Sequence, residues 1–273
     1  MGPITGRLPG QEGQDTIMKR ALQSVLVVIL LISLQACADG ASVSDNGGLV
    51  QSYKGSREGA AKRAVAEALI SLKQQNYGNA IALAGRAIDT GKASGADDRL
   101  LSLAYLIRAS AYLSTRALSE AEADIGLALE RNPHSAFAYQ QRGALNGLRG
   151  HYRRSIADYS RSIDIEPRFG PYFLRGITYL KTKQLLRARK DLTRAIAIDP
   201  NRANAFYWRG VARTVSGKRR LALSDFRKTL ALDPGHRGAR AALRNQGRRR
   251  PGTPAVPRTP EEFPDATVHT ISL

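Results

Sequence analysis

The side chains able to do chemistry are few in this chain, and their spacing does not form a catalytic constellation. Motifs of zinc proteases, serine hydrolases and phosphate-binding loops, such as HExxH, GxSxG or a Walker loop, do not occur. The single cysteine, Cys37, excludes an intramolecular disulfide and a multi-cysteine zinc site. The four histidines lie without metal-ligand spacing at His134, His151, His236 and His269. The sequence therefore predicts no enzyme, no cofactor and no metal site, with a hydrolase that lacks a recognisable motif as the alternative.

Two charged residues recur in four successive stretches of the chain. Each stretch has an arginine directly before a small residue and, further along, an aspartate directly before a large apolar residue. The pairs are Arg108 and Asp124, Arg142 and Asp158, Arg175 and Asp191, and Arg209 and Asp225. We expect a ladder of Arg–Asp contacts between packed helices, which would set their register more than it would add stability. The alternative is that both charges are solvated.

The elements that must position these charges are marked by four prolines. They recur at intervals of 33 or 34 residues, and each follows Asp, Glu or Asn at the end of a stretch with helical apolar spacing. The prolines are Pro133, Pro167, Pro200 and Pro234. A period of about 34 residues is typical of a helix–turn–helix solenoid. The repeats span 102–135, 136–168, 169–202 and 203–236.

Within each repeat, small and large residues alternate in register. The first helix has an aromatic residue four positions before a small one: Tyr105 and Ala109, Tyr139 and Gly143, Tyr172 and Gly176, Phe206 and Gly210. The second helix has a small residue four positions before a large apolar one: Ala121 and Ile125, Ser155 and Tyr159, Ala188 and Leu192, Ala222 and Phe226. We expect the small residues to let two antiparallel helices approach closely, and the bulky residues to fill the gap to the next repeat.

This pattern resembles the tetratricopeptide repeat (TPR) family over about half the chain. Asp199-Pro200 matches the usual ending of such a repeat, whereas Asn146 and Arg213 stand where the family usually has an aromatic residue. The resemblance implies an all-α fold, a right-handed superhelix of helix–turn–helix repeats. Terminal repeats are expected to be atypical. We therefore predict a degenerate first repeat with its connector in 58–101, and a polar capping helix at 237–244.

The family resemblance also implies a binding surface, because the first helices of TPR domains line a concave groove for peptides or partner helices. The matching positions here are Leu103, Leu106, Ser110, Leu113, Phe137, Gln140, Ala144, Phe173, Ile177, Leu180, Asn204, Tyr207 and Val211. Most are apolar or aromatic, and the Lys/Asn clamp of chaperone-binding members is absent. This favours a protein partner with an apolar or amphipathic segment. Alternatively, some of these residues pack between repeats or lie under the chain's own tail; Trp208 beside them is either an interface anchor or packing.

The N-terminal stretch predicts export. A basic region that opens with Met18-Lys19-Arg20 precedes a mostly apolar run over 21–35. As a helix this run would be roughly 22 Å long, too short for the ~30 Å core of a bilayer. It reads as the apolar region of a signal peptide spanning 18–36, with 1–17 as an over-extended start. The alternative is a cytosolic protein with a buried apolar N-terminal helix.

The residues that end this run, Leu34 to Cys37, resemble the lipobox of bacterial lipoproteins, although Gln35 is larger than the family's usual residue. The resemblance implies that Cys37 is lipidated with palmitate and becomes the first mature residue, followed by a flexible tether over 37–57. Ala38 rather than Asp follows the cysteine, which favours the outer membrane. The alternative is an ordinary signal peptide with an accidental cysteine.

The charge of the chain, +19 with a sequence pI of about 10.6, favours anionic partners. The tail, 245–273, is basic and proline-rich and is predicted to be disordered. This basic C-terminal end either contacts anionic lipid or lipopolysaccharide, or is a solvated cap and tail. The sequence as a whole favours a non-enzymatic, lipid-anchored periplasmic scaffold of the cell envelope that serves envelope, pilus or secretion assembly. The alternative is a basic protein that binds an anionic polymer, lipopolysaccharide or nucleic acid, although an exported protein does not normally meet nucleic acid.

Overall fold

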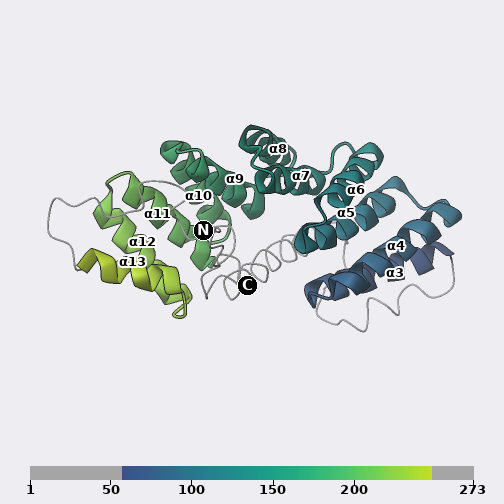
Figure 1. Ribbon diagram of the computed structural model, residues 1–273, viewed down its shortest axis with the longest axis horizontal. Helices are drawn as coiled ribbons and strands as arrows, with labels where there is room; N and C mark the ends of the chain where they lie inside the picture. The colour runs from purple at the N-terminus through teal and green to yellow at the C-terminus, as the bar shows by residue number, and fades with distance from the viewer. Residues whose placement is uncertain (1–56, 248–273) are drawn as a thin grey trace, which may run out of the picture. The chain divides into compact units, whose positions relative to one another are not determined.

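The computed structural model of the 273-residue chain describes residues 57–247, and in this part every regular element is an α-helix (Figure 1). The predicted signal peptide, lipidation site and tether, and nearly all of the tail, lie outside the described residues. The helices are α3 (Arg57–Lys73), α4 (Tyr77–Ser94), α5 (Asp98–Thr115), α6 (Leu118–Arg131), α7 (Ala136–Leu148), α8 (Tyr152–Ile165), α9 (Phe169–Lys181), α10 (Leu185–Ile198), α11 (Ala203–Val215), α12 (Arg219–Leu232) and α13 (Arg237–Gly247). None of the described helices is long and apolar enough to cross a membrane.

The described residues fall into two compact units, 57–121 and 122–247. In the first unit, α3 packs on α4, and α5 packs on both. Its core is built from small and aliphatic residues such as Ala68, Leu72 and Ile107, each fully buried. The predicted degenerate repeat is thus a real helical hairpin. The next helix begins at Asp98, earlier than the predicted repeat boundary, because the Asp97 side chain accepts a hydrogen bond from the Leu100 N–H at 2.6 Å and caps it there.

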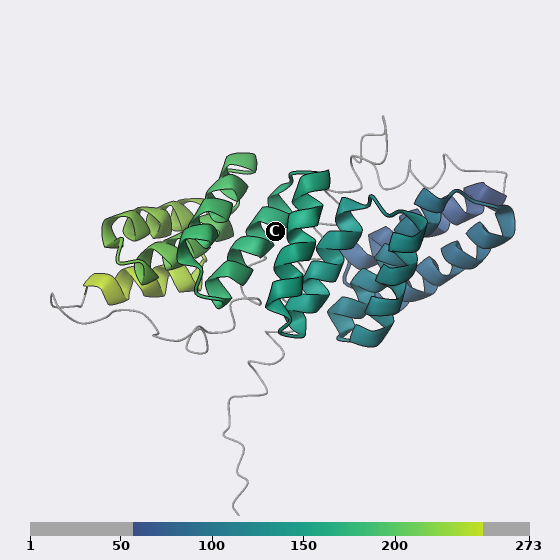
Figure 2. The same cartoon turned by 90° about the horizontal axis from the view of Figure 1, so that it is seen from above.

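The second unit is a row of helical hairpins. Helices α7 and α8, α9 and α10, and α11 and α12 pair, and α8 packs on α9, α10 on α11 and α12 on α13 (Figures 1 and 2). Each hairpin matches one predicted repeat, and α13 matches the predicted capping helix. The architecture is therefore the predicted all-α solenoid of helix–turn–helix repeats.

The turn inside each hairpin depends on one residue in the left-handed conformation. Gly150, Lys183 and Gly217 occupy equivalent positions with φ of 78°, 59° and 71°. The residue after each one donates its N–H, at 2.8 Å, to a carbonyl in the last turn of the preceding helix. This satisfies a carbonyl that the helix end would otherwise leave without a partner. Glycine takes this conformation without steric cost, so Lys183 is the strained member of the set.

The turn between hairpins explains why an acid or amide precedes most of the repeat-ending prolines. The side chains of Asn132, Asp199 and Asp233 each accept a hydrogen bond from the backbone N–H two residues on, at 3.3, 3.1 and 2.9 Å. These short side chains thereby close a local turn. The proline that follows cannot continue the helix, so the chain reverses at this point.

Close helix approach inside each hairpin comes from a glycine facing a bulky side chain. A Cβ atom added to the glycine would lie within 3 Å of its partner: 2.8 Å for Gly143 and Tyr159, 2.9 Å for Gly176 and Leu192, and 2.7 Å for Gly210 and Phe226. We expected the bulky residues to fill the gap to the next repeat. Each one lies on the glycine of its own hairpin, because the missing Cβ opens the space there. Their contact with the next repeat stays a prediction.

Candidate functional site

The Arg–Asp pairs predicted from the sequence form in all three hairpins of the second unit. Each joins the first helix of a hairpin to its second helix. The N–O distances are 2.7 Å for Arg142 and Asp158, 2.7 and 3.0 Å for Arg175 and Asp191, and 2.8 and 3.1 Å for Arg209 and Asp225. The fourth pair, Arg108 and Asp124, has one member in each unit and stays a prediction.

The same arginines also bind neighbouring hairpins. Arg175 donates from Nη1 to Ser160 Oγ on α8 at 2.8 Å, and Arg209 donates from Nη1 to Thr193 Oγ1 on α10 at 3.3 Å. Ser160 and Thr193 occupy equivalent positions in successive second helices. The pairs therefore form within repeats, and each of these two arginines adds a bond between repeats.

Each ladder arginine also lies over the aromatic ring three residues before it. The distances from the guanidinium carbon to the ring centroid are 5.7 Å for Tyr105, 5.1 Å for Tyr139, 5.7 Å for Tyr172 and 5.5 Å for Phe206. A residue three positions earlier on a helix lies on the same face. The recurring aromatic residue of the first helix is thus a platform for the arginine, held by cation–π attraction.

The two departures from the family pattern gain a role in the structure. Asn146 donates from Nδ2 to Asp158 Oδ2 at 2.8 Å, and Arg213 donates from Nη1 to Asp225 Oδ2 at 2.7 Å. Both lie four residues after the ladder arginine, one helical turn further on, so they reach the same carboxylate. The equivalent position in the middle hairpin is Tyr179. The i+4 spacing of these donors was the signal in the sequence that could have revealed them.

Burial shows that these pairs serve the fold. The Asp158, Asp191 and Asp225 side chains are only 8%, 7% and 3% exposed. Burial by itself would lower the pKa of Arg175, but its hydrogen bonds to Asp191 and the charge of that carboxylate raise it. Each of these buried aspartates is thus paired inside its own hairpin.

The predicted groove residues are mostly covered. Seven are buried: Leu106, Ser110, Leu113, Gln140, Phe173, Ile177 and Val211. Six are partly exposed: Leu103, Phe137, Ala144, Leu180, Asn204 and Tyr207. In the second unit, the apolar surface that remains accessible at these positions is therefore formed by Phe137 and Ala144 on α7 and Leu180 on α9. We call these three residues the first-helix row.

Two predicted groove residues contact the capping helix α13 or the residue directly before it. Asn204 Oδ1 lies 3.1 Å from His236 Nε2, and the Tyr207 and His236 ring centroids are 4.5 Å apart. The Tyr207 ring also lies against Gly238, where an added Cβ would come within 2.8 Å of it. Sequence reasoning missed this contact, because nothing in the repeat pattern shows where a capping helix packs. Trp208, 4% exposed and edge-on to Tyr207 at 5.2 Å, is packing rather than an accessible anchor.

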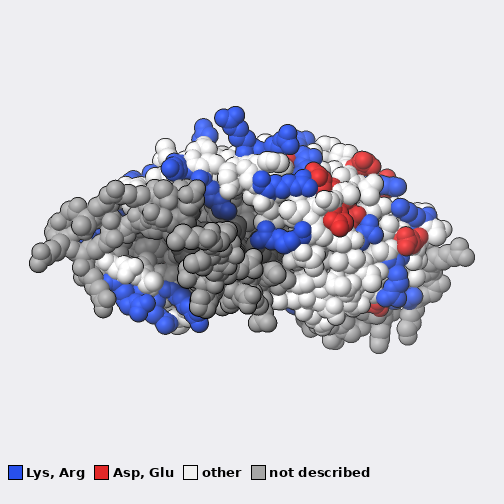
Figure 3. Space-filling model, in the orientation of Figure 1, with Lys and Arg blue, Asp and Glu red and all other residues white. Residues whose placement is uncertain are grey.

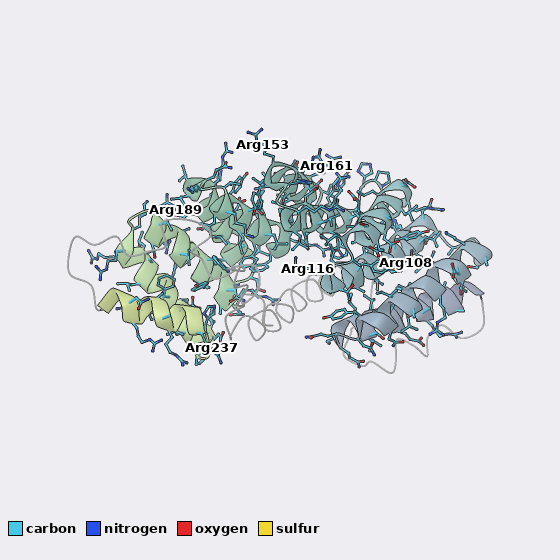
Figure 4. The ribbon with its side chains drawn as sticks, viewed as in Figure 1. Arg108, Arg116, Arg153, Arg161, Arg189 and Arg237 are labelled. Atoms are coloured by element: carbon cyan, nitrogen blue, oxygen red, sulfur yellow. The ribbon has the colours of Figure 1, made fainter. Side chains whose placement is uncertain are left out.

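Positive charge is concentrated in the second unit. Residues 122–247 contain 25 Lys and Arg against 10 Asp and Glu, whereas residues 57–121 contain 9 against 6. Figure 3 shows Lys and Arg side chains along the upper margin of the molecule, and Figure 4 places Arg153, Arg161 and Arg189 there. Outside the ladder, α8, α10 and α12 retain only one acidic residue, Asp164. The second helices therefore carry a largely uncompensated basic surface.

These features define a solenoid of tetratricopeptide repeats, a fold that serves as an interaction scaffold. Residues 170–202 match the tetratricopeptide repeat family itself. A 90-residue segment is 31% identical to serine/threonine-protein phosphatase 5 of Rattus norvegicus. That match covers 33% of this chain and 18% of the relative, so the chain spans less than a fifth of that protein.

Two solved structures share the fold. PilF of Pseudomonas aeruginosa has a TM-score of 0.61 at 14% sequence identity, covering 69% of this chain and 82% of PilF. YrrB, a TPR protein with an unusual peptide-binding site, has a TM-score of 0.51 at 17% identity, covering 73% of this chain and all of YrrB. At these identities the similarity shows the fold alone.

Proposed function

We propose that this chain is a non-enzymatic scaffold whose first-helix row binds an apolar or amphipathic segment of a partner protein. The observation that carries this is the row itself: Phe137, Ala144 and Leu180 are partly exposed on two successive first helices of one unit. A row of apolar side chains on parallel helices fits the apolar face of a partner helix or an extended chain. The peptide-binding site of YrrB, which has the same fold, supports this proposal.

The Arg–Asp ladder contributes to binding indirectly. Arg175 joins α9 to α10 and to α8 through bonds of 2.7 to 3.0 Å. Helices held in this way present the row with little loss of conformational freedom when a partner docks. Binding then costs less than it would on a surface that must first become ordered.

The proposed function includes a location at the cell envelope. The thiol of Cys37 carries a lipid that anchors the scaffold to the envelope, on the periplasmic side of the outer membrane. Its support is the apolar run that ends at the only cysteine of the chain. Under this proposal the partner belongs to an envelope assembly, such as a pilus or a secretion machine.

Site-specific crosslinking tests the binding surface. A photoreactive amino acid is placed at Phe137 or Leu180, with Ile198 as the control because it is apolar, 45% exposed and located on a second helix. We expect the same partner to be captured from both row positions and not from the control. The partner is then identified, purified and titrated against Leu180→Glu, which should weaken binding at least ~10-fold, because a charge would be buried against apolar surface. Equal capture from all three positions, or unchanged affinity of the variant, would reject the row as the site.

The anchor has a separate test. Cys37→Ala should abolish palmitate incorporation, while circular dichroism shows unchanged helix content, because the described helices begin at Arg57. Palmitate that persists in the variant would disprove the assignment of the lipid to Cys37.

A further inference from the structure

Three equivalent segments at the turns of the second unit share an unusual composition. They are 150–154, 183–187 and 217–221, which lead into α8, α10 and α12, and we call them the turn edge. Together they contain seven Lys and Arg and no Asp or Glu. Because successive hairpins pack in the same order, equivalent turns lie along one edge of the unit. Arg153, in the first of these segments, points away from the ribbon in Figure 4.

Arg187 at this edge bonds Gln184 and lies over Tyr179, but the position of these cations at helix starts does not stabilise the helices. Acidic residues are favoured in the first turn of a helix, and cations there are unfavourable, because the helix dipole is positive at that end. None of α8, α10 and α12 has an acidic residue in its first turn. Among the described ion pairs, none includes Arg153, Arg154 or Arg220. The arrangement therefore indicates a negatively charged partner.

Exposed leucines stand among these cations. Leu186 is 72% exposed and Leu221 is 49% exposed, and they directly adjoin Arg187 and Arg220. In the repeat register Leu186 aligns with Arg153 and with Arg220. Cationic side chains interleaved with exposed aliphatic ones are typical of surfaces that lie on an anionic bilayer, where the aliphatic groups enter the boundary between headgroups and acyl chains. A nucleic acid would bind the charges and stack on aromatic rings, and it would make no use of the leucines.

We propose that the turn edge is a docking surface for an anionic phospholipid bilayer. Its arginines contact the phosphate headgroups, and Leu186 and Leu221 insert below them. The surface differs from the first-helix row, because its segments lie at the hairpin turns and the starts of second helices, although the Leu180 carbonyl of the row accepts a hydrogen bond from the Lys183 N–H. The proposal requires neither the lipid anchor nor a protein partner, so it can fail or succeed independently of the scaffold function.

A single-label experiment tests this proposal on the full chain. Cys37→Ala removes the only cysteine, so Leu186→Cys then gives one site for an environment-sensitive fluorophore. Ile198→Cys is the matched control, since it is an exposed apolar residue (45%) at the other end of the same helix, α10. Each labelled protein is mixed with phosphatidylglycerol-containing vesicles, with pure phosphatidylcholine vesicles, and with a single-stranded oligonucleotide.

We expect the label at 186, and not the one at 198, to shift to an apolar environment, and only with the phosphatidylglycerol vesicles. An equal response at both positions would mean attachment through another part of the chain, and would overturn the proposal. A response at 186 to the oligonucleotide alone would identify a nucleic-acid surface instead. A shift that depends on protein concentration without vesicles would identify a contact between two copies of the chain.

Charge removal supplies a second measurement. The variant Arg153→Gln/Arg154→Gln should bind the anionic vesicles ~25-fold more weakly, because each cation near such a surface contributes about five-fold to affinity. Arg237→Gln/Arg240→Gln, on α13, is the control with the same loss of charge, and it should change binding much less. Equal effects of the two double variants would show that net charge alone, and not the turn edge, determines binding.

Discussion

Replacement of Arg175 by methionine should be the most destabilising single change among the three charged pairs. Asp191 is buried, with 7% of its side chain exposed, and Arg175 donates to both of its carboxylate oxygens at 2.7 and 3.0 Å. Methionine preserves the apolar stem but leaves the carboxylate without these donors. Removing one partner of a buried ion pair costs about 3 to 5 kcal/mol. Because 16% of the Arg175 side chain is exposed, we expect the lower end, about 3 kcal/mol.

The other two pairs provide graded controls. The Arg142 side chain is 44% exposed, and Asn146 still donates to Asp158 after its removal, so Arg142→Met should cost at most about 1 kcal/mol. Arg209→Met should fall between the two, because Asp225 keeps its bond to Arg213. The expected order of destabilisation is therefore Arg175→Met, then Arg209→Met, then Arg142→Met.

Urea unfolding followed by circular dichroism measures this order. The double variant Arg175→Met/Asp191→Leu should recover most of the lost stability, because no charge is then left buried without a partner. Two results would refute the reasoning: equal losses for Arg175→Met and Arg142→Met, or a double variant no more stable than Arg175→Met alone.

Three further changes test the packing and the cap. Gly210→Ala should cost about 2 kcal/mol in urea unfolding, because the new Cβ would lie 2.7 Å from Phe226; an unchanged midpoint would show that the ring moves aside freely. Lys183→Gly should raise stability by up to ~1 kcal/mol and Gly217→Ala should lower it by about as much, since both positions have positive φ; a change of the same sign in both would contradict this. Burial lowers the pKa of His236, whose Nδ1 accepts the Ala239 N–H, so the folded chain favours the neutral ring. As the pH falls below about 6.5, the unfolded chain takes up this proton first, and the melting temperature should fall until the pH reaches the folded pKa. His236→Gln should lose this part of the pH dependence. If the melting temperature falls with pH equally steeply in both proteins, His236 is not the group responsible.

Periodic features were predictable from the sequence. The hairpin boundaries and the Arg–Asp pairs each follow a spacing that recurs every 33 or 34 residues. The pattern in one repeat would be weak evidence for a hairpin, but its recurrence in four repeats is strong evidence. The predicted start of the second full repeat, residue 136, is the first residue of α7. Helix α5 begins at Asp98, four residues before the predicted repeat at 102, because the Asp97 cap sets its start and the repeat period does not.

Contacts that do not repeat were missed. The capping helix packs on Tyr207, so one end of the predicted groove is occupied by the chain itself. The bulky residues of the second helices lie on glycines of their own hairpins, a contact that the expected filling of the gap to the next repeat did not include. Both outcomes depend on how helices lie against each other in space, and a single repeat contains no information about this.

The sequence by itself determined that paired helices form and which residues recur on them, because helix period, small residues and turn chemistry are local properties of each repeat. Only the tertiary structure decided how much of the first-helix row remains accessible and which donors meet each aspartate. Asn146 and Arg213 reach Asp158 and Asp225 because the second helix of each hairpin packs within hydrogen-bonding distance of the first-helix turn that contains these donors. The burial of a first-helix side chain depends on neighbours in other hairpins and in the capping helix, so it is determined only when the helices pack together.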